Sequence, residues 1–587
     1  MFREIFQSWP RFKSTGITGF EDDEPHISRI PKPHRCLEVP EIVALIISHV
    51  DDRPSFRTLS QVSRTLSDLA IDALYADLDS WFELFMCLPR SLWNLKPPPS
   101  PRMFSGGRFG KCGNGMRVWT LCFRRKMAEK EWTFLRSRAA KVRSIGFRHV
   151  PHSGVGRISS EGWNSLVYRR SQSIGPKSIM ADQSVIDALV NAAPSVPVLF
   201  PNLCALALGH GCPAPALRML LSPGLRKLHV STGLLLDIAN LTSPSAPDLC
   251  PFVESFHVQE ELRFIRQNAS ARLICGWKHL RSIGGAVPID QHVWKHLASL
   301  SSLDTLEIRA FSPPSRARAG ICNKLREIDT LILSGGQYKD TISALEAVLG
   351  DRGPDTRFVV RRVDIRVLSS IASPDDSVVH LASALPELVY AETLRELRVA
   401  SGRSLSPRDS DRPSVDDLLL PFVAFYGLTT VDLSTHLNGR SFTHPQLMDL
   451  ACHWPSLEVL RLSSSQEAFS LQELLALGQV CPKIRIIDIP VMVSMANIRE
   501  ISTQMDSVRC LENATCLRLR GYPETKEDME ATVNVMGKLV PRLRHPNCER
   551  EDEEVAWNSV MGSMGKEPEV EKRELFRRYA RAMCQCQ

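Results

Sequence analysis

The feature that most constrains this chain is a short apolar pattern that returns along most of its 587 residues. The pattern places apolar side chains at the first, fourth and sixth positions of a hexamer, as Leu303, Leu306 and Ile308 do. Such alternation is typical of a short strand with one buried face. From residue 303 onward the hexamers begin 25 to 34 residues apart, which chance apolar clusters would not do. The other hexamers begin at residues 142, 203, 225, 328, 360, 394, 428, 457, 484 and 514, and the last one ends at Leu519.

Helical patterns lie between several of these strands. Residues 445–452, 471–477 and 297–300 carry apolar side chains three or four positions apart, and a short turn containing Pro or Ser leads from each to the next strand. A unit of this kind cannot bury its apolar face alone and has to stack on its neighbours. The sequence therefore predicts an α/β repeat array over residues 136–545. A doubly wound α/β domain is the alternative, and it predicts no constant period.

The repeats resemble those of an irregular leucine-rich-repeat solenoid, as found behind an F-box in fungal proteins. The resemblance implies a horseshoe with strands on the concave side and helices outside. The Asn or Cys that usually follows the strand is mostly replaced by Ser, Gly or Ala, which implies degenerate turns. Loop insertions are expected at residues 151–185, 241–250 and 401–415, which are polar and rich in Ser, Pro or Gly. Residues 546–587 are interpreted as a cap and tail, because a solenoid needs a polar closing element.

A helical module is predicted ahead of the repeats, at residues 36–80, behind a flexible leader at residues 1–35. Pro40 and Glu41 suit the first turn of a helix. Ile42, Ile46 and Val50 then recur every four residues, and Val43 and Ile47 lie beside them. A second helix is expected to begin near Ser55 and to place Phe56, Leu59, Val62 and Leu66 on one face, with Leu69, Ala73, Leu74 and Leu78 extending the pattern after a kink.

This module is similar to an F-box. The family typically opens with Leu-Pro-x-Glu-Ile-Leu, continues with Leu-x-x-Val-Cys-Arg-x-Trp and ends in a Leu-Trp pair. Here the corresponding residues are Val39 to Val43, Leu59 to Leu66, and Leu74 with Tyr75. The departures from the family pattern are Val39 for Leu, Ser63 for Cys, Leu66 for Trp and Tyr75 for Trp.

The resemblance implies the substrate-recognition subunit of an SCF-type E3 ubiquitin ligase. In that role the F-box docks a Skp-type adaptor, which hangs from a cullin, and the solenoid holds a target protein that the sequence does not identify. Such a receptor works by proximity and contributes no catalytic group. The alternative is a non-ligase scaffold whose helical module only caps the solenoid. The candidate adaptor-binding residues are Pro40, Glu41, Ile42, Ile46, Ile47, Val50, Leu59, Val62 and Leu66.

Composition limits the other classes of function. A hydrophobic content of 43% with 23% charged residues is that of an ordinary globular protein, and no apolar run is long enough to span a membrane. The net charge of +7 is small for a nucleic-acid binder. Arg108 to Arg143 holds eleven Lys or Arg and two Glu, which we interpret as a solvated helix face, with nucleic-acid association as the alternative. The scattered cysteines indicate reduced thiols and a cytoplasmic or nuclear location.

No catalytic, cofactor or metal motif is found between these elements. Residues 81–135 are interpreted as a linker helix followed by a basic insert rich in Pro and Gly. The insert fails as a phosphate loop because Ser105 and Cys112 stand where Gly and Ser or Thr are required. No Cys-x-x-Cys pair exists. We therefore expect no enzyme activity and no cofactor. The basic amino terminus also allows a transit peptide, although the acidic residues at 21–24 argue against it.

Overall fold

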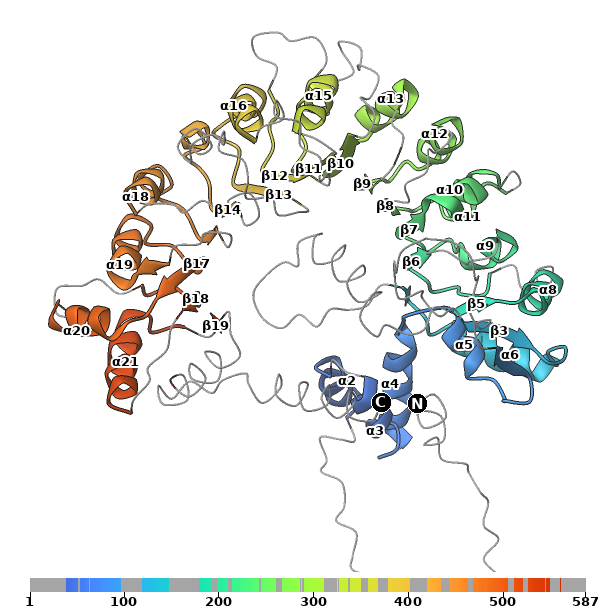
Figure 1. Cartoon of the computed structure of the whole chain (residues 1–587). Coiled ribbons are helices and arrows are strands. Elements are labelled where there is room, and N and C mark those ends of the chain that lie inside the picture. Colours follow the sequence, from blue (N-terminus) through green and yellow to red (C-terminus); the bar gives the residue numbers. More distant parts are fainter. Residues whose placement is uncertain are drawn as a thin grey trace, which may run out of the picture. The chain divides into compact units, whose positions relative to one another are not determined.

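A computed structural model gives the fold of the chain (Figure 1). By its internal contacts the chain divides into two compact units, Met1–Tyr75 and Ala76–Gln587. The structure describes residues 39–50, 53–62, 64–96, 119–146, 179–192, 198–208, 214–241, 244–259, 267–285, 287, 290–310, 325, 327–335, 338–349, 357–367, 378–401, 420–433, 444–462, 468–504, 511–520, 526–543, 545–548 and 560.

The described part of the first unit is helical. Its helices are α2 (Pro40–Ser48), α3 (Arg53–Leu59) and α4 (Arg64–Ala76). Pro40 occupies the first turn of α2, where a missing N–H costs no hydrogen bond. Two expectations were wrong: the second helix already begins at Arg53, and Leu78 belongs to a strand instead of a helix.

A small sheet opens the second unit. Strands β2 (Trp93–Lys96) and β3 (Trp119–Phe123) are antiparallel, and β3 pairs in parallel with β5 (Ile179–Ala181). Helices α5 (Phe82–Met86), α6 (Glu129–Ala139) and α8 (Gln183–Ala192) belong to the same region. The sequence predicted a linker at residues 81–135 and a loop at 151–185, and none of these three strands. They are short, and a long stretch of sequence separates each strand from its partner.

The second sheet is large, and its described strand pairs are parallel. It has 16 strands within the described residues, and all but β16 follow one another in sequence order across the sheet. A doubly wound domain would reverse its strand order, so that alternative was wrong. The prediction of an α/β repeat array is confirmed. The strands are β1 (Asp77–Leu78), β4 (Ser144–Ile145), β6 (Ala205–Leu208), β7 (Lys227–Ser231), β8 (Ser255–Gln259), β9 (Ser282–Gly285), β10 (Thr305–Ala310), β11 (Thr330–Gly335), β12 (Arg362–Val367), β13 (Glu396–Ser401), β14 (Thr430–Asp432), β15 (Val459–Arg461), β16 (Phe469–Ser470), β17 (Ile486–Met492), β18 (Cys516–Arg520) and β19 (His545–Cys548).

One layer of helices accompanies this sheet. The helices between successive strands lie on one side of it and pack against one another in sequence order (Figure 1). Helix α11 lies in segment 241–250, where we expected a loop; Ser245 and Asp248 cap its first turn. These helices are α9 (Ala214–Leu220), α10 (Thr232–Ala239), α11 (Ala246–Leu249), α12 (Gln267–Gly276), α13 (Gln291–Ser299), α15 (Tyr338–Leu349), α16 (Val378–Leu388), η2 (Leu420–Ala424), α18 (His444–Cys452), α19 (Leu471–Val480), α20 (Met495–Gln504) and α21 (Lys526–Leu539).

The core lies between the strands and this helix layer. The three apolar positions of the hexamer are buried, as Leu394, Leu397 and Val399 show. The second position binds the repeats together through the backbone, since its carbonyl accepts hydrogen bonds from two successive N–H groups of the next repeat. The carbonyl of Arg361, for example, accepts from the N–H groups of Arg395 and Glu396. Burial and backbone pairing therefore share the period found in the sequence.

The strand series is longer than the sequence predicted. Two strands were not predicted: β8, although Val253, Phe256 and Val258 fit the hexamer, and β9, where Gly285 replaces the last apolar residue. Closing the series at Leu519 was also wrong, because β19 pairs in parallel with β18 beyond it. The charged segment 549–554 predicted to begin the cap lies outside the described residues.

Candidate functional site

The first candidate site is an apolar row on α2. Val39, Ile42, Leu45 and Ile46 lie three or four residues apart and so share one helix face. Ile42 and Ile46 are 39% and 40% exposed, and Leu45 is 60% exposed. A second face of the same helix supplies the core of the unit, so this row is left over after the unit has packed.

The core behind the row comes from α2 and α4. Val43, Ile47, Leu66 and Ala70 are buried together. Partly buried apolar side chains pack around them, namely Phe56, Leu59, Leu69 and Ala73. The unit therefore has a packed interior of its own, and the exposed row is separate from it.

The nine residues predicted to bind an adaptor differ in burial, and only some of them are exposed. Ile47 and Leu66 belong to the core, so their role is packing. Val50 and Leu59 are half-buried. Leu45, the most exposed member of the row, was missed because the search followed a spacing of four and not of three. The predicted residues that are exposed are Pro40, Glu41, Ile42, Ile46 and Val62.

The second candidate site is a row of polar side chains on the helix-free face of the large sheet. The fifth hexamer position alternates with the buried fourth and sixth positions, so it points away from the helix layer. Parallel pairing brings these residues into register on neighbouring strands as far as β17, and a register shift then places Arg518 of β18 opposite Pro490. From β12 the charges alternate strictly in sign. The row from β10 to β18 comprises Glu307, Ile332, Asp364, Arg398, Asp432, Arg461, Asp488 and Arg518.

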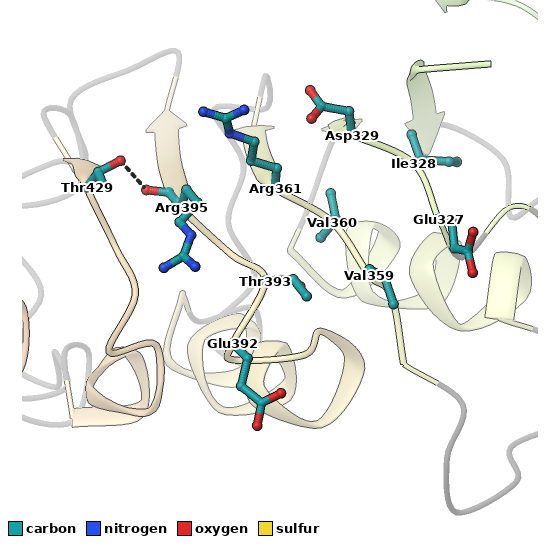
Figure 2. Close-up of a pocket in the computed structure, with 10 residues that line it drawn as sticks. All are labelled: Glu327, Ile328, Asp329, Val359, Val360, Arg361, Glu392, Thr393, Arg395 and Thr429. Carbon is teal, nitrogen blue, oxygen red and sulfur yellow. Dashed lines mark hydrogen bonds between the residues drawn. The ribbon is translucent and has the colours of Figure 1, made fainter. Parts of the chain in front are cut away.

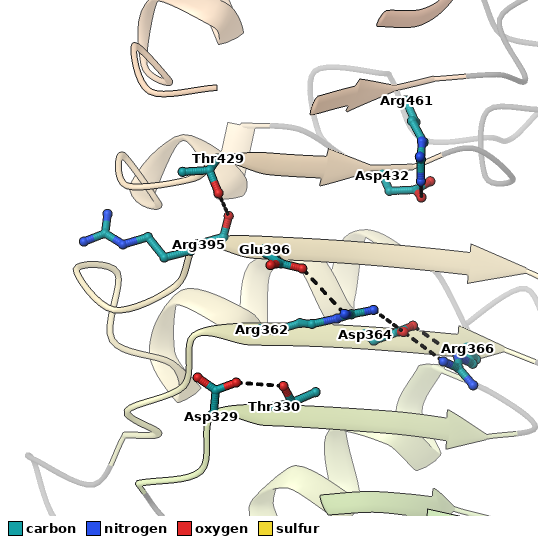
Figure 3. Close-up of polar contacts among 10 residues, drawn as sticks. All are labelled: Asp329, Thr330, Arg362, Asp364, Arg366, Arg395, Glu396, Thr429, Asp432 and Arg461. Atoms are coloured by element: carbon teal, nitrogen blue, oxygen red, sulfur yellow. Dashed lines mark hydrogen bonds and ion pairs between the residues drawn. The ribbon is translucent and has the colours of Figure 1, made fainter. Parts of the chain in front are cut away.

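Ion pairs join this row to the positions beside it (Figure 3). Asp364, which is 0% exposed, accepts two hydrogen bonds from Arg366, at 3.2 Å from Nε and 2.9 Å from Nη2. Arg362 lies 3.6 Å from Asp364 and 3.6 Å from Glu396. A buried carboxylate has to be paired in this way, because an isolated buried charge costs several kcal/mol.

Two members of the row have buried atoms without a hydrogen-bond partner, Oδ1 of Asp488 and two nitrogens of Arg398, and Arg398 has the larger deficit. Its side chain is buried, yet Nε and Nη1 have no hydrogen-bond partner. The two aspartates at the same register are already engaged, since Asp364 accepts from Arg366 and Asp432 pairs with Arg461 at 3.3 Å. Burial lowers the pKa of Arg398, and the charge of Arg362 lowers it further, while Asp432 and Asp364 raise it. The cluster thus holds a guanidinium that its own carboxylates do not satisfy.

Two histidines continue the row on β7 and β8. The rings of His229 and His257 lie 5.1 Å apart, and His257 Nδ1 lies 3.5 Å from Glu307 Oε2. Burial, and then the nearby His257, lower the pKa of His229 to about 3, so it is neutral at pH 7. Gly284 stands between His257 and Glu307, and a Cβ there would lie 2.7 Å from Glu307 Oε2. The glycine therefore lets the pair meet across β9.

A groove lies at the amino ends of β11 to β14 (Figure 2). It has a volume of about 780 Å³, and its walls come from the turns that lead into these strands. Arg361 and Arg395 stand along it with Glu327, Asp329 and Glu392. Arg395 Nη1 donates to the Gly427 carbonyl at 3.0 Å, which fixes its side chain. The mixed charges and open shape suit a protein surface better than a small-molecule site.

The other predicted features carry no site in the described residues. In the basic stripe, Arg125 pairs with Glu131 and Arg136 with Glu129, which neutralises part of its charge. Burial raises the pKa of the Cys250 thiol to about 12, as expected of an inert buried cysteine. Among these residues we find neither a metal-binding group of side chains nor a helix long and apolar enough to cross a membrane. The insert at 97–118 and the serine-rich loop at 404–411 lie outside them.

The fold and its side-chain rows define a class: an α/β repeat protein whose sheet carries a charged, largely buried row on its helix-free face, together with a small helical unit. No family model matches the sequence, and no curated protein matches it. Among solved structures, the chain is similar to a leucine-rich-repeat protein from Leptospira interrogans, with 12% identity and a TM-score of 0.26. The match covers 59% of this chain and 84% of that one.

Proposed function

We propose that this protein is the substrate receptor of an SCF-type ubiquitin ligase, with α2 docking a Skp-type adaptor and the sheet face binding a target protein. The observation that best supports this proposal is that α2 has both a buried apolar face and an exposed apolar row. A helix that only capped the solenoid would have no need for a second apolar face. A helix that both packs its own unit and docks a partner needs two.

The size of the row supports a docking role. Val39, Ile42, Leu45 and Ile46 are each roughly half exposed. Covering the remaining surface would contribute about 1 kcal/mol per side chain, or about 4 kcal/mol in total. A micromolar complex requires about 8 kcal/mol. The row is therefore a substantial part of an interface, and further contacts of the module have to supply the remainder.

The departures from the F-box pattern bear mainly on packing. Leu66 and Tyr75, which replace two tryptophans of the family, are both buried. Val39 is 39% exposed and extends the apolar row in place of the usual leucine. Ser63 lies outside the described residues. Three of the four substitutions thus keep an apolar or aromatic side chain where the proposal needs one.

In the second unit, the groove at the strand ends and the half-buried end of the charged row, at Arg461, Asp488 and Arg518, offer polar surface to a protein target. Alternating charges fix the register and orientation of a partner, because a wrongly placed partner meets like charges. The proposed mechanism is proximity: the receptor holds the target near the ubiquitin-charged enzyme and performs no chemistry itself.

Co-purification with a Skp-type adaptor tests the proposal. The variant Ile42→Asp with Ile46→Asp places two charges in the row and leaves the core residues unchanged, so the protein should fold and lose the adaptor. Ala44→Asp is the matched control, since Ala44 is exposed on the same helix but lies off the row. It should retain the adaptor. Retention of the adaptor by the double variant, or failure of the wild-type protein to bind any Skp-type adaptor, would leave only the non-ligase scaffold.

A further inference from the structure

A charge imbalance is built into the row around Arg398. Four guanidinium groups lie on β12, β13 and β15, from Arg362, Arg366, Arg398 and Arg461. Among the described residues three carboxylates face them, from Asp364, Glu396 and Asp432, so these seven side chains carry a net charge of +1 (4 − 3). Within this cluster, Nε of Arg362 and both Nε and Nη1 of Arg398 have no hydrogen-bond partner, so Arg398 has the larger deficit.

Leaving a buried guanidinium unsatisfied is costly, because it loses hydration and gains no hydrogen bond. Arg398 is 8% exposed, so little water reaches it. The carboxylates at its register are held by other arginines at 2.9 Å and 3.3 Å. A planar guanidinium with free N–H groups matches the paired oxygens of a carboxylate or phosphate.

We propose that Arg398, flanked by Arg362 and Arg366, is a receptor for one anionic group of the target protein, a phosphate or a side-chain carboxylate. This inference rests on the proposed target-binding role of the sheet face. It adds that the target presents an anion at the register of β13. The adaptor surface on α2 plays no part in it.

A substitution at Ala400 can test this proposal by supplying a carboxylate to Arg398 from the chain itself. Arg366 binds Asp364 from two residues away on the same strand. Ala400 stands in the same relation to Arg398, is only half-buried, and pairs in register with Arg366. An aspartate at position 400 would therefore place a carboxylate between two arginines. It should raise the melting temperature without added anion and abolish any further effect of anions.

The test is thermal unfolding of the purified full chain in inorganic phosphate, with chloride at matched ionic strength as the baseline. A ligand that binds only the folded protein raises the melting temperature. Phosphate should do so saturably for the wild-type protein, and Arg398→Gln should raise the half-saturating concentration at least about tenfold. Arg518→Gln is the matched control, because Arg518 belongs to the same row and is paired with Asp488. It should respond as the wild-type protein does.

Acetate in a parallel series distinguishes the two sources of the anion. A response to phosphate alone indicates a phosphorylated target residue, and a response to both anions indicates that a carboxylate suffices. An equal phosphate response in the wild-type protein and Arg398→Gln, together with no stabilisation by Ala400→Asp, would overturn the inference. The measurement uses neither adaptor nor target, so its failure is distinct from a failure of adaptor docking.

Discussion

Glu131 at the start of α6 gives a quantitative test of the structure. Its side chain is 4% exposed and accepts from Arg125 through two nitrogens, at 2.5 Å and 2.8 Å. The N–H of Ala128 donates to Oε2 at 2.8 Å. The hydrogen bonds from Arg125 are the main reason that the pKa of Glu131 falls from 4.5 to about 2, against the opposing effect of burial. Glu131→Gln removes this charge and keeps the shape.

The shift sets the size of the effect. A fall of about 2.5 pKa units corresponds to about 3.4 kcal/mol of stability at pH 7, at about 1.36 kcal/mol per unit. Arg125 is 43% exposed, so solvent screens the pair, and we expect about 2 kcal/mol from Glu131→Gln. Because the folded pKa is lowered, this stability is complete above the unfolded pKa of about 4.5 and is lost as the pH falls towards 2.

The assay is denaturant unfolding of the wild-type protein and Glu131→Gln at pH 7 and pH 3. The difference in unfolding free energy should shrink by more than half at pH 3. Glu129→Gln is the control: Glu129 is in the same helical turn, and its side chain is 78% exposed. That change should alter stability by less than about 0.5 kcal/mol. A difference between wild type and Glu131→Gln that stays constant from pH 7 to pH 3 would refute the assigned ion pair.

Two further predictions concern backbone geometry and the α2 core. Gly285 has a φ of +87°, and a Cβ there would lie 1.9 Å from the Val258 carbonyl oxygen, so Gly285→Ala should lower the unfolding free energy by more than about 2 kcal/mol. Gly233→Ala, in an open helical position, should instead stabilise by about 0.5 kcal/mol in the same denaturant assay. Val43→Asp puts a charge into the first unit's core, whereas Ile42→Asp changes an exposed residue. Limited trypsin digestion should therefore cut α3 and α4 rapidly only in the Val43 variant, and equal cutting would contradict the assigned faces.

The repeat array was predictable because one physical cause produces both the sequence pattern and the fold. Each repeat has to bury three apolar side chains at fixed positions, as it does with Leu457, Leu460 and Leu462. The spacing of apolar residues in the sequence therefore equals the spacing of the buried residues in the fold. The prediction of strands failed where a repeat lacks this apolar pattern. In β9 a glycine takes the last apolar position, and in β19 His545 to Cys548 has no apolar pair at all. Both strands pair in parallel with a neighbour through the backbone, and that pairing leaves little trace in composition.

On α2 the sequence left a different question open, namely which of two adjacent apolar faces packs inward. Apolar residues occupy positions 42, 43, 45, 46 and 47, which is most of the circumference of the helix. Spacing alone cannot say which of two adjacent apolar faces packs inward, because both satisfy the same helical period. The position of α4 decides it, by placing Leu66 and Ala70 against Val43 and Ile47. The face that we propose for docking is what remains exposed, and it includes Leu45.

The charged row could have been read from the sequence with one added premise. Parallel repeats that bury the fourth and sixth hexamer positions in register also align the fifth position on the opposite face. Taken in order from residue 364, that position reads Asp, Arg, Asp, Arg, Asp and Arg. This alignment does not predict which side chains form ion pairs. Arg362 and Arg366 lie at other hexamer positions, and both contact Asp364. Nε and Nη1 of Arg398 are left without a hydrogen-bond partner, and our proposal of an anion from the target rests on that observation.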